Sequence, residues 1–433
     1  ITDKTTTEVT MKAAIYEKYR SILRAELITA EGCTEPIAVA YAAAKARDVL
    51  GTFPEQLSLV CSGNVIKNVM GVAIPHSGGR RGMDVAAILG ALGGNADRAL
   101  EVLDDVTEEQ VARIDPLLRS GFCRCSLAEG AEKLYIGVTA TRGSDSAFVE
   151  IRLHHTNITR IHRNSEVLFD ASAQETVEID RSCLDLHDIL GYAADENMDT
   201  LRDILCGQIK KNTAISREGL ANPYGAQVGR CLLKANPEDA HTRICAAAAA
   251  ASDARMGGCA MPVVINSGSG NQGIAVSVPV IEYARQNDVE EERLIRALAV
   301  SNLVSLSVKR YIGALSAFCG VVCAASGAGA AITWLRGGDE NEVAMTIVNS
   351  LGTISGMVCD GAKPSCAAKI AAAVRVALMA DEMSRRGCVF QAGEGIISAN
   401  IEDTIRRIGI LGKEGMYETD NVILRMMLDR STV

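Results

Sequence analysis

The chain has 433 residues, 48% of them hydrophobic and 22% charged, which is the composition of a globular protein of two or three domains. Its net charge is −9, so it offers no basic surface, and we expect neither nucleic acid nor a membrane as a partner. The start is polar and charged, unlike a secretory signal, so we expect a cytoplasmic protein whose 14 cysteines are reduced. The most apolar run, Phe318–Trp334, is too short and too rich in glycine to span a bilayer.

The N-terminal part is predicted to be helical on both sides of a cysteine motif. A helix is expected over Thr7–Leu27, then the motif EGCTEP at Glu31–Pro36, then a helix over Ile37–Leu50. Thr34 is a candidate cap of the second helix, which places Cys33 just before its N-terminus. Backbone N–H groups favour a thiolate there, so we expect a lowered pKa for Cys33; the alternative is a buried loop cysteine.

The middle of the chain, residues 51–179, combines strands and helices. Strands are predicted over Gln56–Val60, Leu134–Ala140 and Ala147–His155, with β character continuing over Thr156–Val167. An apolar helix is predicted over Met83–Leu92 and a polar, acidic helical region over Asp97–Leu118. We interpret the histidines of this region, His154, His155 and His162, as solvated strand residues, because adjacent strand residues face opposite sides.

From about residue 180 the pattern becomes helical. The expected helices are Leu184–Ala193, Met198–Asn212, His241–Gly258, Glu291–Val308, Ala314–Ile332, Asn341–Thr353 and Ala367–Ala380. We therefore predict a mainly α protein, in which residues 1–50 and 180–433 form a helical domain. Residues 51–179 are predicted to form an α+β domain inserted into it near the N-terminus.

Two loops have the composition of a ligand-binding surface. NSGSGNQG, at Asn266–Gly273, offers many backbone N–H groups without bulk, which suits an amino-acid carboxylate; the alternative is an interdomain turn. A turn is also predicted at Ser62–Asn64. We expect five of these residues to face one cavity and to bind a substrate carboxylate and amine: Ser62, Asn64, Ser269, Gly270 and Asn271.

A second cysteine motif, CDGAKPSC, lies at Cys359–Cys366. Asp-Gly and Lys-Pro steps predict a tight loop before the helix over Ala367–Ala380, with Ser365 as a plausible cap. Cysteines at a helix N-terminus favour the thiolate, the form that binds soft metals and iron–sulfur clusters. The alternative is an ordinary surface loop that carries two small apolar residues.

Together, EGCTEP, NSGSGNQG and CDGAKPSC resemble the motifs of the L-cysteine desulfidase family, a relative of the iron–sulfur L-serine dehydratases. The resemblance extends from about Tyr19 to Arg406. It implies a helical catalytic domain, a [4Fe-4S] cluster and no pyridoxal phosphate. It also implies conversion of L-cysteine to pyruvate, ammonia and sulfide.

The resemblance also suggests roles for individual cysteines. Cys359 and Cys366 resemble the paired cysteines of the dehydratase cluster loop, although their spacing is shorter here, and Cys319 resembles the upstream cluster cysteine. Cys33 resembles a desulfidase cysteine that ligates the cluster or acts directly in the chemistry. Three cysteine ligands would leave one iron open as a Lewis acid. We interpret the other cysteines as structural or core residues, with Cys323 a weaker ligand candidate.

The sequence leaves the base and the substrate open. Candidates for removing the α-proton are Cys33, Lys363 and His76, in that order, but we favour an ion pair of Lys363 with Asp360. We expect a small amino-acid substrate and considered a homodimer as the assembly. The alternatives are an L-serine dehydratase and a non-enzymatic cluster or ligand sensor; a zinc protein is disfavoured because the cysteines lack C-x-x-C pairing.

Overall fold

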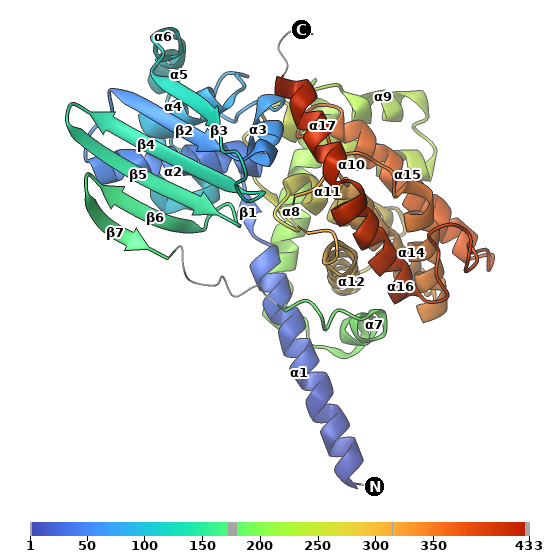
Figure 1. The fold of residues 1–433 in the computed structure, drawn as a ribbon. Helices are drawn as coiled ribbons and strands as arrows, with labels where there is room; N and C mark the ends of the chain where they lie inside the picture. The colour runs from blue at the N-terminus through green and yellow to red at the C-terminus, as the bar shows by residue number, and fades with distance from the viewer. Residues whose placement is uncertain (1, 172–179, 314, 429–433) are drawn as a thin grey trace.

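A six-stranded sheet forms one side of the molecule and a bundle of helices forms the other (Figure 1). The computed structural model describes residues 2–171, 180–313 and 315–428. The predicted domain limit at residue 179, and Ala314 at the start of a predicted helix, lie outside these residues. The predicted fold class, mainly α with an α+β part near the N-terminus, is confirmed.

The sheet has the strand order β3-β2-β4-β5-β6-β7, and β2 is parallel to β3 while the other neighbours are antiparallel. The strands are β2 Gln56–Cys61, β3 Cys123–Leu127, β4 Tyr135–Arg142, β5 Asp145–Arg152, β6 Ile158–Arg163 and β7 Glu166–Asp170. Sequence reasoning missed β3, whose residues CRCSL are mostly exposed and lack apolar alternation. It forms the edge of the sheet and pairs only with β2 among the described strands.

Helices rich in alanine cover one face of the sheet (Figure 1). α2 (Thr34–Leu50) packs against β4 and β5, and α4 (Met83–Gly93) packs against α2. The two helices approach so closely that a Cβ at Gly90 would lie 2.2 Å from the backbone oxygen of Ala40. α2, which we assigned to the helical domain, therefore lies on the sheet, and the limits of the two domains stay a prediction.

Shorter helices complete this side of the molecule: α3 Gly63–Met70, η1 Ala96–Glu101, α5 Glu108–Ala112 and α6 Ile114–Arg119. The last three replace the continuous helical region predicted from residue 97 to residue 118. The turn predicted at Ser62–Asn64 is wrong, because Ser62 is the N-cap of α3 and the helix begins at Gly63. Serine and asparagine are favoured both in turns and at helix N-termini, so these residue types alone do not distinguish a turn from the start of a helix.

The helical side contains α1 Thr2–Glu26, α7 Leu186–Asp195, α8 Asp199–Ala221, α9 Val228–Ala235, α10 Ala240–Met256, α11 Gly270–Gln286, α12 Glu291–Lys309, α13 Val321–Leu335, α14 Glu340–Ile354, α15 Cys366–Ser384, α16 Ile401–Ile410, η2 Leu411–Gly415 and α17 Tyr417–Leu428. α13 is apolar on nearly all sides and is surrounded by α11, α12, α14 and α15. In the described ranges, no helix combines the length and the apolar character that crossing a membrane requires.

A two-stranded ribbon joins the two sides of the molecule. β1 (Thr29–Ala30) pairs antiparallel with β8 (Val263–Val264), although more than 230 residues separate them. EGCTEP follows β1 directly, and the NSGSGNQG loop begins two residues after β8. The hydroxyl of Thr34 then donates a hydrogen bond to the backbone oxygen of Gly268 at 3.0 Å. The ribbon thus holds two sequence motifs against each other where the sheet meets the helices.

Candidate functional site

The structure brings four predicted cysteines to one cavity of about 1120 Å³, which is lined by Cys33, Cys319, Cys359 and Cys366. Cys319 and Cys359 are held side by side, because a β-bridge joins the residues that precede them, Phe318 and Val358. Cys366 is the first residue of α15 and packs beside Cys33. The four thiols come from three segments that lie far apart in the chain, at residue 33, residue 319 and residues 359–366. In the sequence, only the family resemblance connected Cys33 and Cys319 with the loop that carries Cys359 and Cys366.

The loop that carries Cys359 and Cys366 is fixed against α3. Gly361 has φ +93°, and a Cβ there would lie 2.2 Å from the backbone oxygen of Lys67, so only glycine fits. Asp360 forms ion pairs with Lys369 and with Lys363, the second at 2.7 Å. Lys363 does not line the cavity. The structure therefore places Lys363 in the ion pair that we favoured and not beside a substrate.

Basic side chains surround the cysteines. Lys67, Arg255 and Lys309 line the cavity, and each is at most 3% exposed. Lys67 forms an ion pair with Asp420 of α17, which is also mostly buried. Within the described residues, the side chains of Arg255 and Lys309 form neither an ion pair nor a hydrogen bond. Buried cations without partners favour the binding of anions.

The thiols fit an iron–sulfur cluster. The pKa of Cys359 is lowered to about 6, because Cys319 donates a hydrogen bond to it and the charge of Lys67 lies close. The same hydrogen bond raises the pKa of Cys319, so the pair shares one proton. Burial raises the pKa of Cys366. Three sulfur donors in a cationic, largely buried pocket suit a cluster that carries net negative charge with its thiolates.

The prediction of a lowered pKa for Cys33 is wrong. Cys33, not Thr34, is the N-cap of α2, and its side chain makes no capping hydrogen bond. Burial and the negative charge of Glu35 raise the pKa of Cys33 well above its usual value, although Arg255 opposes this shift. The thiol instead donates a hydrogen bond to Glu35 Oε2 at 3.2 Å. Cys33 is therefore a neutral thiol held in place by a buried carboxylate.

The carboxylate of Glu35 accepts hydrogen bonds from several side chains. Its Oε1 accepts from Asn68 Nδ2 at 2.9 Å, and its Oε2 accepts from the hydroxyl of Thr34 at 3.1 Å as well as from Cys33. His155 Nε2 lies 3.6 Å from Oε1. Burial alone would raise the pKa of Glu35, but His155 and these donors hold it at about 2. Glu35 is thus a permanently charged acceptor at the cavity wall.

His155 corrects our interpretation of the histidines. It lies in the loop between β5 and β6, its side chain is only 12% exposed, and it lines the cavity together with His154. Its partner, Glu35, lies 120 residues earlier in the chain. Alternation along a strand carries no information about such a contact, so no local sequence signal could have identified it.

The predicted substrate-binding residues divide into two groups. Asn64, Ser269 and Asn271 line the cavity, and Asn64 Oδ1 is buried without a hydrogen-bond partner. Ser62 and Gly270 do not line it. Ser62 Oγ is occupied, because it accepts the N–H of Tyr135 and donates to the backbone oxygen of Lys133.

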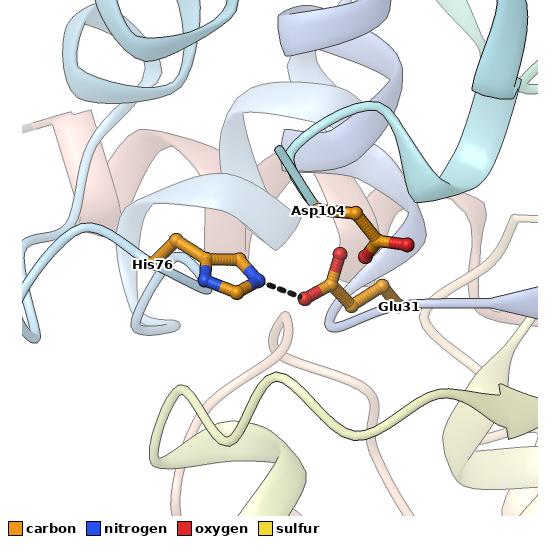
Figure 2. Close-up of side chains that lie close together, drawn as sticks. All are labelled: Glu31, His76 and Asp104. Carbon is orange, nitrogen blue, oxygen red and sulfur yellow. Dashed lines mark hydrogen bonds and ion pairs between the residues drawn. The ribbon is translucent and has the colours of Figure 1, made fainter. Parts of the chain in front are cut away.

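His76, the third candidate base, lies outside this cavity. Figure 2 shows its Nε2 directed at Glu31 Oε1, 2.7 Å away, with the carboxylate of Asp104 beside Glu31. One ligand atom from each of these side chains lies within 4.8 Å of the others, so the group could hold a cation. It contains no sulfur and is separate from the cysteines. The structure does not bring His76 to the predicted site.

The other cysteines only partly follow our interpretation as core residues. Cys61, Cys245 and Cys259 are buried, as expected, and Cys323, the weaker ligand candidate, is buried but does not line the cavity. Cys231 and Cys388 are exposed, which corrects that interpretation for these two.

Comparison with known sequences finds relatives over most of the chain. The sequence model described as "Serine dehydratase alpha chain" matches residues 97–425. A "UPF0597 protein" of Lachnoclostridium phytofermentans is 48% identical over 417 residues, which are 96% of this chain and all of the relative. "UPF0597 protein" relatives from Treponema denticola and Desulfitobacterium hafniense are each 45% identical over 95–96% of this chain and 97–98% of their own.

Proposed function

The chain belongs to the serine dehydratase alpha chain family, and from that premise we propose that it is an iron–sulfur-dependent lyase that converts L-cysteine to pyruvate, ammonia and sulfide. The observation that carries the proposal is the meeting of Cys319, Cys359 and Cys366 in one cationic cavity. These three thiolates would hold a [4Fe-4S] cluster, whose open iron supplies a Lewis acid for the leaving sulfur. No pyridoxal phosphate is needed.

In the proposed reaction, His155 removes the α-proton of the substrate. His155 lines the cavity, and Glu35 lies close enough to orient the ring and to stabilise the imidazolium once the proton has been taken. The C–H electron pair forms the Cα=Cβ bond as the C–S bond breaks, and the sulfur leaves as sulfide. The aminoacrylate product then reacts with water to give pyruvate and ammonia.

Cys33 keeps a role in this proposal, but not as the base. A neutral thiol that already donates to Glu35 has no lone pair poised for an α-proton at neutral pH. We assign it to positioning: it helps to fix Glu35 and occupies the wall beside Cys366. Lys363 and His76 are no longer candidates for the base, because neither lines the cavity.

L-Serine is the second candidate substrate, and the description of the matching family favours it. Elimination of hydroxide would use the same base and the same open iron. The desulfidase assignment rests on the amino-acid sequences of the three motifs. The cysteine desulfidase and serine dehydratase activities must therefore be distinguished by measurement.

The test is anaerobic reconstitution with iron and sulfide, followed by iron analysis and by assays of pyruvate with L-cysteine and with L-serine. We expect turnover of L-cysteine to exceed that of L-serine. Cys359→Ala should lose both bound iron and activity, because water does not replace a thiolate ligand in a stable cluster. Cys388→Ala, at an exposed cysteine that does not line the cavity, is the control and should keep both.

The variant Cys33→Ala tests whether Cys33 is a ligand of the cluster or acts in the reaction without binding iron, the two roles that the family resemblance leaves open. As a positioning residue, Cys33 should be dispensable for the visible absorbance of the cluster but not for full turnover. Loss of iron from Cys33→Ala would make Cys33 a ligand instead. A reconstituted wild-type protein that holds iron yet releases pyruvate from neither amino acid would refute the proposed function.

A further inference from the structure

Arg255 is a buried cation that forms no ion pair with any residue in the part of the chain that the structure describes. It lies in the last turn of α10, is 2% exposed and ranks among the largest fully buried side chains. Within the parts of the chain that the structure describes, its guanidinium forms neither an ion pair nor a hydrogen bond, and Nε is buried without a partner. Burying an unpaired charge is costly, so such a group is retained where an anion from outside completes it.

The carboxylates near Arg255 form no ion pair with it among the described residues. Glu35 shares the cavity with it but is occupied by its own donors, Asn68, Thr34 and Cys33. Asp253 lies two residues earlier on the same helix; its Oδ2 accepts the backbone N–H of Gly229 at 2.9 Å, and its Oδ1 is buried without a hydrogen-bond partner, so neither oxygen is paired with Arg255. Arg255 therefore faces the cavity with its charge available.

The N-terminus of helix α11 lies against the guanidinium of Arg255. α11 begins at Gly270, and a Cβ at that position would lie 2.3 Å from Nε of Arg255, so the absence of a side chain lets the guanidinium lie against the first turn. The first N–H groups of a helix have no acceptor within the helix and favour an anion, as does its dipole. The next residue, Asn271, lines the cavity.

We propose that Arg255 binds the α-carboxylate of the amino-acid substrate, an inference that rests on the proposed lyase function. A guanidinium presents parallel N–H donors that match the two oxygens of a carboxylate. The carboxylate would lie between Arg255 and the start of α11, in the same cavity as the three cysteines and His155. The site would therefore select α-amino acids with a free carboxylate and reject their amides. Sequence reasoning assigned binding of the substrate carboxylate and amine to Ser62, Asn64, Ser269, Gly270 and Asn271, and did not include Arg255.

The test measures binding and needs no turnover. L-Alanine has the carboxylate and amine of the substrate but no leaving group, whereas L-alaninamide lacks the carboxylate. Calorimetric titration of the reconstituted enzyme should show L-alanine binding at least about tenfold more tightly to the wild type than to Arg255→Met. L-Alaninamide should bind equally weakly to both. Arg243→Gln, on the surface of the same helix, is the matched control and should bind L-alanine like the wild type.

Thermal unfolding of the ligand-free proteins separates a binding role from a structural one. An unpartnered buried charge does not stabilise the empty protein, so Arg255→Met should melt at the wild-type temperature or above. Equal affinity of the wild type and Arg255→Met for L-alanine, or no binding by the wild type, would overturn the proposal. Arg255-dependent binding of L-alanine without elimination from cysteine or serine would instead refute the proposed reaction and leave this inference intact.

Discussion

Two glutamates, Glu31 and Glu35, flank Cys33 in the sequence, and each lies beside a histidine. The two glutamate–histidine pairs differ in what surrounds the carboxylate. Glu31 pairs with His76 at 2.7 Å, outside the cysteine cavity, and Glu35 lies 3.6 Å from His155 inside it. Both carboxylates are buried. Burial and the neighbouring Asp104 raise the pKa of Glu31 to about 7 despite the hydrogen bond from His76, whereas the pKa of Glu35 is held at about 2.

The difference shows that burial, which raises the pKa of both carboxylates, does not decide their charge alone: His155 and the donor Cys33 outweigh burial at Glu35, whereas at Glu31 burial and Asp104 outweigh His76. Glu31 Oε2 has no hydrogen-bond partner, while both oxygens of Glu35 accept from neutral donors. Each donor stabilises the ionised form and offsets part of the desolvation cost. Only the second pair has a fixed negative charge at neutral pH, as an imidazole needs if it is to take a proton from a substrate.

The difference between the two glutamate–histidine pairs is tested most directly by replacing the two histidines separately. His155→Gln should lower kcat by roughly 10³-fold with little change in KM, because loss of a general base removes that order of acceleration. His76→Gln should change kcat by less than about threefold, since His76 does not line the cavity.

Iron content must be equal in the two histidine variants for the comparison to hold. If His76→Gln proves as damaging as His155→Gln at equal iron content, the base has been assigned to the wrong pair.

A smaller effect is expected from the two carboxylates. Glu35→Gln keeps the volume of the side chain but removes the charge beside His155, so kcat should fall by roughly 10²-fold while the base itself remains. Glu31→Gln should keep kcat within about threefold. Steady-state kinetics with L-cysteine measures both, and a harmless Glu35→Gln would mean that His155 needs no carboxylate.

The smallest effect concerns the dependence of stability on pH. Because the pKa of Glu31 is higher in the folded protein than in the unfolded chain, the folded state binds the extra proton. Stability should therefore fall as pH rises from about 4.5 to about 7, by an amount on the order of 3 kcal/mol at most. His76, whose pKa is also raised by Glu31, adds a loss in the same direction above about pH 6.5.

Urea unfolding at intervals between pH 5 and pH 7 measures this slope, and Glu31→Gln should flatten it. Glu35 contributes in the opposite direction and only at lower pH, because its stabilisation is lost as pH falls from about 4.5 towards 2. A wild-type slope that Glu31→Gln leaves unchanged would show that other groups cause it.

The sequence predicts the helices well and the site in part. Helical periodicity and alternation identified α10, α12, α14 and α15 to within a few residues, together with β2, β4 and β5, and one predicted β stretch covers β6 and the start of β7. β3 was missed because its residues CRCSL show no apolar alternation, and α3 was missed because Ser62, Gly63 and Asn64 at its start have the composition of a turn. The cysteine motifs could be found because their residue types are chemically distinctive. His155 and Arg255 could not, because their significance lies in contacts with segments far away in the chain.

The ion pair of Lys67 with Asp420 has a consequence for the order of events during synthesis. The cavity wall beside Cys359 is secured by a residue that emerges from the ribosome 353 positions after its partner. Cys33 and Glu35 are made early, whereas Cys366 follows roughly 15–70 s later at usual rates of translation. Cys319, Cys359 and Cys366 meet only after residue 366 has been added, so, under the proposed function, the chain cannot hold a cluster with all three ligands before that point. During that interval the buried basic and acidic groups of the site are exposed on an unfinished protein.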